Sequence, residues 1–445
     1  MCAREILNWL GIDELNAMQQ ETIQAYRRSD NLVLLSPTGS GKTLAYLLPL
    51  IEAIDSRSDR VQALVVVPSR ELATQTCDVV RRMRTEVRTT AVYGGRPAME
   101  EHRTLRGLLP HLIIGTPGRL LDHLDKENII GIDIRTLIID EFDKCLELGF
   151  RDEMTQLMSH LRSVEKRMLL SATDAPEITH FLPEYRRLDF LGGEKSSGHI
   201  NHYVVRSPEK DKLNTLRQLL LSLGRETSLV FVGYRESVER VAKFLRREGF
   251  YATAMHGGME QRDRERNLFL FTSGASNILV STDLASRGLD IPALDNVIHY
   301  HLPLNEETMT HRNGRTARRD RDGRSLFILG PEETFNLQNF QNFQDFQDFD
   351  DFTTMSTGIP IPLWELLYIG KGKKDKLSRG DIAGFLMKVG GLTKEELGRI
   401  EVRDHWSFAT VSRARTKSLL NHIRGQKIKG MRTIVEVVNY RIPRA

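Results

Sequence analysis

A glycine-rich segment at residues 36–43 has the residue types and spacing of a phosphate-binding loop. It reads Ser-Pro-Thr-Gly-Ser-Gly-Lys-Thr and stands between an apolar run at residues 31–35, which predicts a buried strand, and a helical pattern that begins at Leu44. Backbone N–H groups of such a loop close around phosphate oxygens, and the N-terminus of the following helix adds partial positive charge. Lys42 would reach the β- and γ-phosphates of a nucleoside triphosphate, and the Thr43 hydroxyl would bind Mg²⁺. We expect phosphate contacts from Ser36, Thr38, Gly39, Ser40, Gly41, Lys42 and Thr43.

Two carboxylates at the end of another apolar run predict the metal and water chemistry of hydrolysis. Asp140 and Glu141 follow residues 137–139, which read Leu-Ile-Ile. Asp140 at the tip of a strand would hold Mg²⁺ directly or through water, and Glu141 would orient and deprotonate the attacking water. The alternative is a charged helix cap that follows a strand. Beside a phosphate-binding loop, the pair favours hydrolysis of a triphosphate.

An arginine-rich segment at residues 311–318 predicts a second set of phosphate contacts. It reads His-Arg-Asn-Gly-Arg-Thr-Ala-Arg, and guanidinium groups beside a glycine turn suit the charge on a transferring phosphoryl group. The alternative is a basic surface loop. Arg315 and Arg318 would reach the γ-phosphate only when two parts of the chain close on each other. Hydrolysis would then be gated by a closure that a bound nucleic-acid strand promotes.

The elements that must position these residues form two sets of buried strands. Short apolar runs alternate with helical patterns, which predicts two α/β units with parallel sheets that bind ligands at the carboxyl ends of their strands. We expect one domain at residues 1–190 and a second at residues 203–335, joined by a flexible linker at residues 191–202. The predicted strands lie at residues 33–35, 63–67, 112–114, 137–139 and 168–170 in the first unit, and at residues 228–232, 252–255, 277–280, 296–300 and 325–329 in the second.

The C-terminal part of the chain contains a phenylalanine-rich tract followed by a segment with a mixed pattern of strands and helices. Phenylalanine recurs at every third residue from Phe340 to Phe352, separated by Asn, Gln and Asp. This period fits neither a helix nor a strand, so we predict a low-complexity linker at residues 336–358. A ladder of aromatic rings for stacking bases is the alternative, and its aspartates disfavour it because they would repel phosphate. Residues 359–445 then show the order strand, helix, strand, strand, helix, strand, which is typical of a small RRM-like α+β domain that binds RNA.

Positive charge is concentrated at the C-terminal end. The 445-residue chain has a net charge of +4, but residues 368–445 hold 18 Lys and Arg residues against 7 Asp and Glu residues. That segment therefore carries +11, and the residues before it carry −7. A basic domain on an acidic body predicts a polyanionic partner, and nucleic acid fits best. A solvated, lysine-rich surface is the alternative.

The cysteines and the hydropathy indicate a cytoplasmic protein with no membrane association. Cys2, Cys77 and Cys145 lie far apart and have neither disulfide nor zinc spacing, which fits a reducing compartment. No apolar run approaches the roughly 18 residues of a membrane span. The first residues lack the charged and then apolar layout of a signal peptide.

Taken together, these motifs resemble those of the DEAD-box RNA helicases of superfamily 2, over residues 1 to about 330. One motif alone is modest support, but the whole set occurs in the family's order. The motifs are Gln19 and residues 36–43, 68–73, 94–95, 116–119, 140–143, 171–173, 281–290 and 311–318. The resemblance implies an α/β fold with two tandem RecA-like domains. It also implies an ATP-dependent RNA helicase, which is an RNA-stimulated ATPase with ATP and Mg²⁺ as cofactors.

The resemblance also implies roles for individual residues. Gln19 would read the adenine edge and Asp290 would contact the ribose. Catalysis would rest on Lys42, Glu141, Arg315 and Arg318, with Asp140 and Thr43 at the metal. Ser171, Thr173 and Asp143 would couple hydrolysis to RNA. The strand groove would be lined by Arg70, Gly95, Thr116, Arg119, Gly257 and Thr282. Contacts of this kind with phosphates and 2′-hydroxyls distinguish RNA from DNA but read little sequence.

The chain departs from the family pattern at three places. Phe142 stands third in the DEAD motif, where a small residue is usual, so we expect altered coupling between hydrolysis and RNA. Cys2 lies about where the family has an aromatic residue that stacks on adenine, which predicts weaker nucleotide affinity. Residues 15–18 lack the usual proline before Gln19, a milder change.

The C-terminal segment resembles the DbpA-type RNA-binding domain at residues 370–381, 402–408 and 425–430. The aromatic-rich RNP signature is absent, so we expect phosphate contacts rather than base stacking. The residues expected to make them are Arg413, Arg415, Lys427 and Lys429. The resemblance implies structured ribosomal RNA as the partner and a role in assembly of the large ribosomal subunit. The oligomeric state is left open, with a monomer as the favoured prediction.

Two other functions remain open at this point. One is a nucleotide-gated RNA clamp or scaffold, in which Phe142 makes ATP turnover weak. A DNA helicase is the third candidate, because the Asp-Glu-x-Asp and His-Arg-x-Gly-Arg patterns occur across the superfamily. Gln19 and the basic C-terminal domain disfavour the DNA helicase.

Overall fold

The computed structural model describes residues 3–37, 39–95, 98–191, 199–286, 291, 294–316, 322–333, 346–349 and 358–438. The chain forms two compact units, one that extends to residue 195 and one that follows it. The second unit contains both the second α/β sheet and the small C-terminal sheet.

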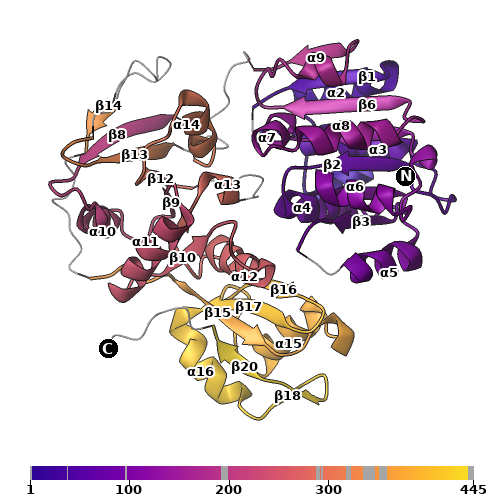
Figure 1. Cartoon of the computed structure of the whole chain (residues 1–445). Coiled ribbons are helices and arrows are strands. Elements are labelled where there is room, and N and C mark those ends of the chain that lie inside the picture. The colour runs from indigo at the N-terminus through magenta and orange to yellow at the C-terminus, as the bar shows by residue number, and fades with distance from the viewer. Residues whose placement is uncertain are drawn as a thin grey trace. The chain divides into compact units, whose positions relative to one another are not determined.

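The first unit is a seven-stranded parallel sheet with helices on both faces (Figure 1), in the strand order β3-β4-β2-β5-β6-β1-β7. Successive side chains of a strand point to opposite faces. Leu34 therefore packs into a core with α1 to α4, whereas Leu35 packs into a second core with α5 to α9. The strands are β1 (Asn31–Leu35), β2 (Ala63–Val66), β3 (Thr89–Val92), β4 (Leu112–Gly115), β5 (Thr136–Ile139), β6 (Lys166–Ser171) and β7 (Arg186–Asp189). The helices are α1 (Ala3–Leu10), α2 (Ala17–Arg28), α3 (Lys42–Ala53), α4 (Arg70–Arg82), α5 (Ala98–Leu108), α6 (Pro117–Asp125), α7 (Phe142–Glu147), α8 (Arg151–His160) and α9 (Ile178–Phe181).

The second unit begins with another seven-stranded parallel sheet, in the order β10-β11-β9-β12-β13-β8-β14. Leu216 of α10 and Val238 of α11 pack with Leu326 of β13, while Met309 of α14 packs with Phe327 on the other side of that strand. The strands are β8 (Ile200–Arg206), β9 (Ser228–Phe231), β10 (Ala252–Met255), β11 (Ile278–Ser281), β12 (Asn296–His299), β13 (Gly323–Leu329) and β14 (Phe346–Asp348). The helices are α10 (Leu213–Ser222), α11 (Arg235–Arg247), α12 (Gln261–Thr272), α13 (Asp283–Ser286) and α14 (Glu306–Asn313).

The C-terminal part of the second unit is a four-stranded antiparallel sheet in the order β16-β17-β15-β20. Leu386 and Leu419, from its two helices, fill the core on one face. Leu366 and Phe408 lie in a separate cluster that includes Phe269 and Leu270 of α12. The elements are β15 (Trp364–Ile369), α15 (Arg379–Lys388), β16 (Leu397–Val402), β17 (Ser407–Ser412), α16 (Arg413–Ile423), the hairpin β18 (Lys427–Ile428) with β19 (Met431–Arg432), and β20 (Val435–Val437).

The predicted fold class is confirmed, and the strands of the two parallel sheets that were not predicted lie at a sheet edge or next to one. β3 and β7 form the two edges of the first sheet, and in β7 only Leu188 is buried. β8 is half-buried over most of its length. An edge strand is covered on fewer sides than a central one, so its sequence lacks the continuous apolar run that marks a buried parallel strand.

The phenylalanine tract contains a strand. β14 pairs in parallel with β8, Phe346 packs edge-to-face on Phe327 with ring centroids 5.3 Å apart, and Phe349 is buried beside Tyr203. The prediction of a linker is therefore wrong for residues 346–349, because two rings of the tract add an edge strand to the second sheet. The rest of the tract before residue 358 lies outside the described residues.

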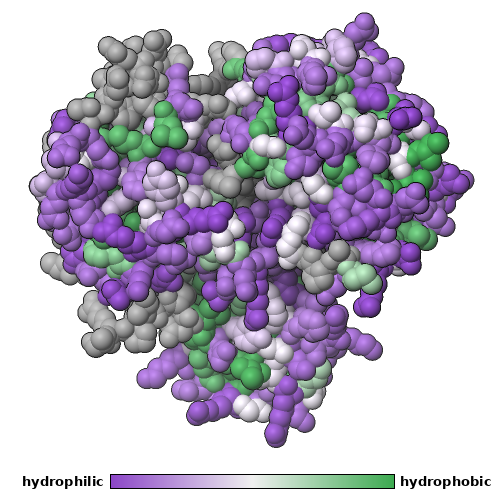
Figure 2. Space-filling model, viewed as in Figure 1, coloured by the Kyte–Doolittle hydropathy of each residue, from purple (hydrophilic) through white to green (hydrophobic). Residues whose placement is uncertain are grey.

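The face of the molecule seen in Figure 2 is dominated by hydrophilic residues, with smaller apolar areas between them. No helix in the described part of the chain has the length and apolar character that a membrane span requires.

Acidification is expected to destabilise the second unit. Burial lowers the pKa of His202 to about 4 and lowers that of His299 well below its usual value. The unfolded chain, with His pKa near 6.5, takes up these protons first, so stability is fully present above about pH 6.5 and falls as the pH drops toward 4. Urea unfolding of the full chain at pH 7.5 and pH 5 measures this loss. His202→Gln is expected to unfold with a weaker pH dependence than the parent, and an identical dependence would contradict the assignment.

Candidate nucleotide and RNA site

The phosphate-binding segment connects the carboxyl end of β1 to the N-terminus of α3. Gly41 precedes the helix with φ of 92°, a left-handed conformation that favours glycine. The Lys42 side chain is buried, and its Nζ donates to the carbonyl oxygens of Ser36 and Pro37, the latter at 3.1 Å. Ser36 Oγ donates to Ser40 Oγ at 2.8 Å. The carbonyls of Ser36 and Pro37 thus hold the side chain of the lysine that is predicted to meet the phosphates.

Gln19 is fixed against this turn. Its backbone N–H donates to Asn16 Oδ1 and its Oε1 accepts from the Asn16 N–H, which forms a capping box at the start of α2. Gln19 Nε2 donates to the Gly41 carbonyl at 3.2 Å, and Asn16 Nδ2 donates to the Ser40 carbonyl at 3.0 Å. The predicted adenine-reading residue is therefore tied to the phosphate-binding segment. No role was predicted for Asn16, although an asparagine three residues before a glutamine is a pattern that indicates a capping box.

The two carboxylates lie directly after β5. Asp140 is only 3% exposed, and its carboxylate accepts from Tyr46 Oη at 3.2 Å and from the Glu141 N–H at 2.9 Å. Burial raises the pKa of the Asp140 carboxyl, and the positive charge of Lys42 opposes that rise. Glu141 adopts φ of 51°, which is uncommon outside glycine and is typical of functional positions.

The donor set fits Mg²⁺ held jointly with a substrate. Mg²⁺ in nucleotide sites binds one or two protein oxygens together with phosphate oxygens and water. Asp140 and Thr43 provide such oxygens in the segments that follow β5 and β1, the two strands on either side of β6. Among the residues described, no group of three or more His, Cys, Asp or Glu side chains could hold a metal by itself. A metal here would therefore depend on the nucleotide for its remaining ligands.

The three predicted coupling residues contact one another. Asp143 Oδ2 accepts from Thr173 Oγ1 at 3.2 Å and from the Ala172 N–H at 3.1 Å. Ser171 Oγ donates to the Thr173 carbonyl at 2.6 Å. These bonds join the segment after β6 to the helix that begins directly after Glu141.

Phe142 is accommodated without loss of these bonds. Its side chain is fully buried and packs edge-to-face on Phe181 of α9, with ring centroids 5.2 Å apart. Asp143 and Thr173 stay within hydrogen-bonding distance with the large ring in place. The extra volume is therefore taken up by the core between α7 and α9.

The residues predicted for the RNA groove of the first unit lie at a different part of the same sheet edge. Arg70 follows β2, Gly95 follows β3, and Thr116 and Arg119 follow β4. These three strands form one half of the sheet, and the strands that carry the nucleotide residues, β5, β6 and β1, form the other half. At the carboxyl ends of the strands, the residues proposed to bind RNA thus lie on one half of the sheet and those proposed to bind the nucleotide lie on the other half.

In the second unit, the arginine motif is bonded to the segment that follows β11. Arg312 forms a bidentate ion pair with Asp283, with distances of 2.6 and 2.8 Å, and also donates to the His301 carbonyl at 2.7 Å. Thr282 directly precedes Asp283, and Arg315 lies within the same motif as Arg312. No separate role was predicted for Arg312. The residue could have been found from its place in the arginine motif, but its ion-pair partner Asp283 lies 29 residues away in the sequence. Thr38, Asp290 and Arg318 lie outside the described residues.

The cations predicted in the C-terminal domain differ in their surroundings. Arg413 donates to the Pro362 and Trp364 carbonyls, to Glu365 and to Tyr251 Oη, so its guanidinium is occupied within the protein. We therefore withdraw Arg413 from the proposed RNA contacts. Arg415 pairs with Glu396 at 3.2 Å. Lys427 and Lys429 are exposed on the β18–β19 hairpin, which the sequence analysis did not predict.

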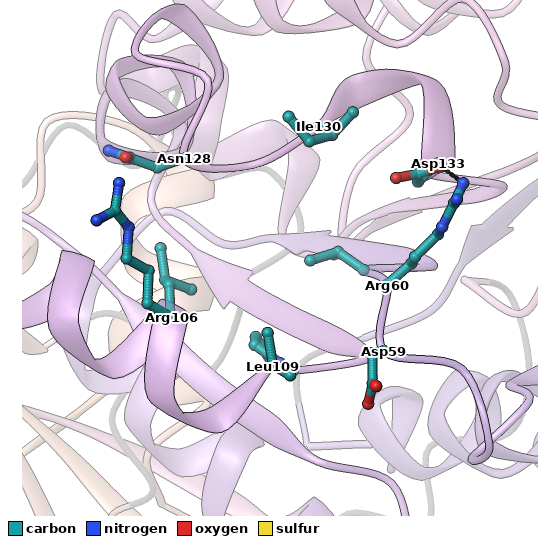
Figure 3. A pocket seen from close by; sticks show the side chains of 10 residues that line it. Asp59, Arg60, Arg106, Leu109, Asn128, Ile130 and Asp133 are labelled. Atoms are coloured by element: carbon teal, nitrogen blue, oxygen red, sulfur yellow. Dashed lines mark hydrogen bonds and ion pairs between the residues drawn. The ribbon is translucent and has the colours of Figure 1, made fainter.

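A cavity of about 280 Å³ in the first unit lies away from these residues (Figure 3). It is lined by Arg60, Leu109 and Asp133, among others, which precede β2, β4 and β5, and Arg60 pairs with Asp133 at 2.7 Å. The cavity therefore lies at the amino ends of the strands, whereas the phosphate-binding segment lies at a carboxyl end. It is not the predicted nucleotide site.

Comparison with known proteins extends over almost the whole chain. Residues 16–181 match the DEAD/DEAH box helicase family, residues 211–320 match the helicase conserved C-terminal domain, and residues 366–437 match the DbpA RNA binding domain. The ATP-dependent RNA helicase DbpA of Escherichia coli is 32% identical over 433 residues, which cover 95% of this chain and 94% of that protein. DbpA of Bacillus subtilis is 28% identical over 97% of this chain and 96% of its own length.

The fold also agrees with that of a solved structure. S. cerevisiae Dbp5 bound to RNA and ADP BeF3 matches with a TM-score of 0.70 and 24% identity, over 79% of this chain and 95% of that chain. The sequence motifs, the two parallel sheets and the relationship to the E. coli protein agree with one another. The chain belongs to the DEAD-box ATP-dependent RNA helicases and carries a C-terminal RNA-binding domain of the DbpA type.

Proposed function

We propose that this helicase locally unwinds or remodels structured ribosomal RNA during assembly of the large ribosomal subunit. The proposal rests on the similarity to DbpA proteins over almost the whole chain, including the RNA-binding domain. The single structural observation that supports coupled hydrolysis is the bond from Thr173 Oγ1 to Asp143, since it connects the ends of β5 and β6. We propose that the chain acts as a monomer in the cytoplasm, and the buried, unpaired Cys77 and Cys145 fit that compartment.

The residues at the carboxyl ends of β1 and β5 would carry out the hydrolysis. Lys42 would leave the carbonyls of its own turn and bind the phosphates, while Gln19 reads the adenine. Mg²⁺, held by Thr43 and Asp140, would supply charge neutralisation at the phosphate oxygens. Glu141 would orient the attacking water and accept its proton. We propose that Arg315, Arg318 and Asp290 of the second sheet domain complete the site.

RNA binding would use the other half of the sheet edge. Arg70, Gly95, Thr116 and Arg119 would contact the sugar–phosphate backbone from the first unit, and Gly257 and Thr282 would do so from the second. Asp143 follows β5, the strand of the nucleotide half that borders β2, and its bond to Thr173 after β6 suits a coupling role that Ser171 would share. ATP and RNA bound together would favour the closed state, and hydrolysis would release the strand.

The C-terminal domain would select the RNA through exposed cations. Lys429 Nζ donates to the Lys376 carbonyl at 3.0 Å, which brings the β18–β19 hairpin to the loop after β15. Exposed lysines therefore gather from two segments, at Lys373, Lys374, Lys376, Lys427 and Lys429. The aromatic residues of the sheet face are less available, because Phe408 stacks on Phe269 of α12 with ring centroids 5.6 Å apart.

Reversing two of these charges is expected to remove RNA preference and to leave basal hydrolysis intact. Lys373→Glu combined with Lys427→Glu changes exposed residues distant in sequence from every predicted ATP contact, so the ATPase rate without RNA should not change. Competition between a ribosomal hairpin and a random structured RNA measures the preference, with Lys417→Glu on α16 as the control. A preference that survives the double substitution would show that this surface does not select the target.

A further inference from the structure

A buried carboxylate in α5 contacts two segments of the proposed RNA groove. Glu101 is only 5% exposed. Its Oε1 accepts from the Tyr93 N–H at 3.1 Å, and Tyr93 directly precedes Gly94 and Gly95. Its Oε2 lies 3.0 Å from Arg119 Nε and 3.1 Å from His123 Nε2. One side chain thus links the segment after β3 to the helix after β4.

Arg119 places a positive charge beside the Glu101 carboxylate. A buried carboxylate is costly unless it is paired and hydrogen-bonded. Arg119, at 15% exposure, supplies that pairing, and His123 Nε2 is a second neighbour of the same carboxylate oxygen. Asn128 Nδ2 lies 3.3 Å from His123 Nδ1 on the other side of the ring.

The contacts of Glu101 also determine how Arg119 and the Gly94–Gly95 segment are oriented in the proposed RNA groove. With Arg119 Nε 3.0 Å from Glu101 and Nη1 3.6 Å from Asp122, Nη2 is the part of the guanidinium that a phosphate would meet. Gly95 has φ of 92°, and a side chain there would collide with the guanidinium of Arg70. The Gly94–Gly95 segment, held through Tyr93, is thus the surface on which Arg70 lies.

We propose that Glu101 is a positioning residue for RNA binding. It does not touch RNA, since it is buried, but it holds Arg119 and the Gly94–Gly95 segment in the arrangement that meets the RNA backbone. No sequence motif indicates this role, because Glu101 lies outside the motifs that identify the family. The inference rests on the proposed assignment of Arg119 to the RNA groove.

Glu101→Gln in the full-length protein tests the proposal, because Gln keeps the size and the acceptor for Tyr93 but loses the charge. We expect the RNA concentration for half-maximal ATPase stimulation to rise about tenfold, the effect of losing roughly one charge-assisted hydrogen bond. The kcat at saturating RNA and the rate without RNA should not change. An unchanged RNA requirement, or an equal fall in the rate without RNA, would overturn the positioning role.

Two further variants separate this inference from the groove assignment. Arg119→Ala should itself raise the RNA requirement, and adding Glu101→Gln to it should have little further effect, because both act through one contact. If Arg119→Ala leaves the RNA requirement unchanged, the groove assignment fails. If Arg119→Ala raises it and Glu101→Gln does not, only the positioning role fails. Should Glu101→Gln lower the melting temperature, Arg119→Lys keeps the charge and removes Nε, and the same tenfold rise is expected.

Discussion

Lys42→Ala is expected to lower RNA-stimulated ATP hydrolysis by at least about 100-fold and to abolish separation of short RNA duplexes. Lys42 is the first residue of α3, and its buried side chain bonds back to the carbonyls of Ser36 and Pro37. It is the cation that would meet the charge developing on the transferred phosphoryl group. Removing a single preorganised group of this kind commonly costs two to three orders of magnitude in rate. Phosphate release and duplex separation, measured at saturating RNA, test the prediction.

The matched control for this substitution is another lysine of the same unit. Lys166 also donates to backbone carbonyls, those of Tyr26 and Ser29, but it lies at the amino end of β6. Lys166→Ala is therefore expected to affect stability more than the rate of hydrolysis by folded protein. Equal rates in Lys42→Ala and the parent would contradict the assignment of the phosphate-binding segment.

Phe142→Ala, which restores a small residue at the third position of the DEAD motif, is expected to destabilise the first unit by about 3–5 kcal/mol. Phe142 is fully buried and packs on Phe181, so the truncation leaves a cavity in the core of α7 and α9. A loss of this size is a large part of the stability of an ordinary domain. Urea unfolding of the full chain measures the change.

An exposed residue of the same unit provides the control. Ile132 is 68% exposed, and Ile132→Ala should change stability by no more than about 0.5 kcal/mol. Phe142→Leu, which removes less volume, should fall between the two. If Phe142→Ala is as stable as the parent and hydrolyses ATP faster, the large ring restricts coupling instead of supporting the core.

The nucleotide site could be predicted from the sequence because its residues belong to short, contiguous motifs. The Gly-Lys-Thr ending after an apolar run and the Asp140–Glu141 pair each sit at the end of a central strand, where buried residues give a continuous signal. Contacts between segments that are far apart in the sequence do not produce a motif that could predict them. The Arg312–Asp283 pair and the Glu101–Arg119 contact depend on which strands lie side by side, and spacing along the chain does not determine that.

The same reasoning accounts for the fold. Central strands were predicted, whereas β7 and β8, whose residues are divided between core and solvent, and the edge strand β3, which has two threonines, were not. Phe346 and Phe349 were assigned to a linker because a repeat of three hides an edge strand that the second sheet supports. In the C-terminal domain, Arg413 had the right charge for RNA, but its position beside Tyr251 and Glu365 depends on tertiary packing.

The central claim is that bound ATP strengthens the grip on RNA and that hydrolysis releases it. Glu141→Gln allows this to be measured at equilibrium, since it should retain ATP binding while slowing hydrolysis by at least about 100-fold. We expect its Kd for a short RNA strand to be at least about tenfold lower with ATP than with ADP, because ATP and RNA stabilise the same closed state. The parent should hydrolyse ATP and then release the strand, whereas a clamp would hold RNA in both forms with little turnover. An RNA affinity in Glu141→Gln that is the same with ATP, with ADP and without nucleotide would contradict the account.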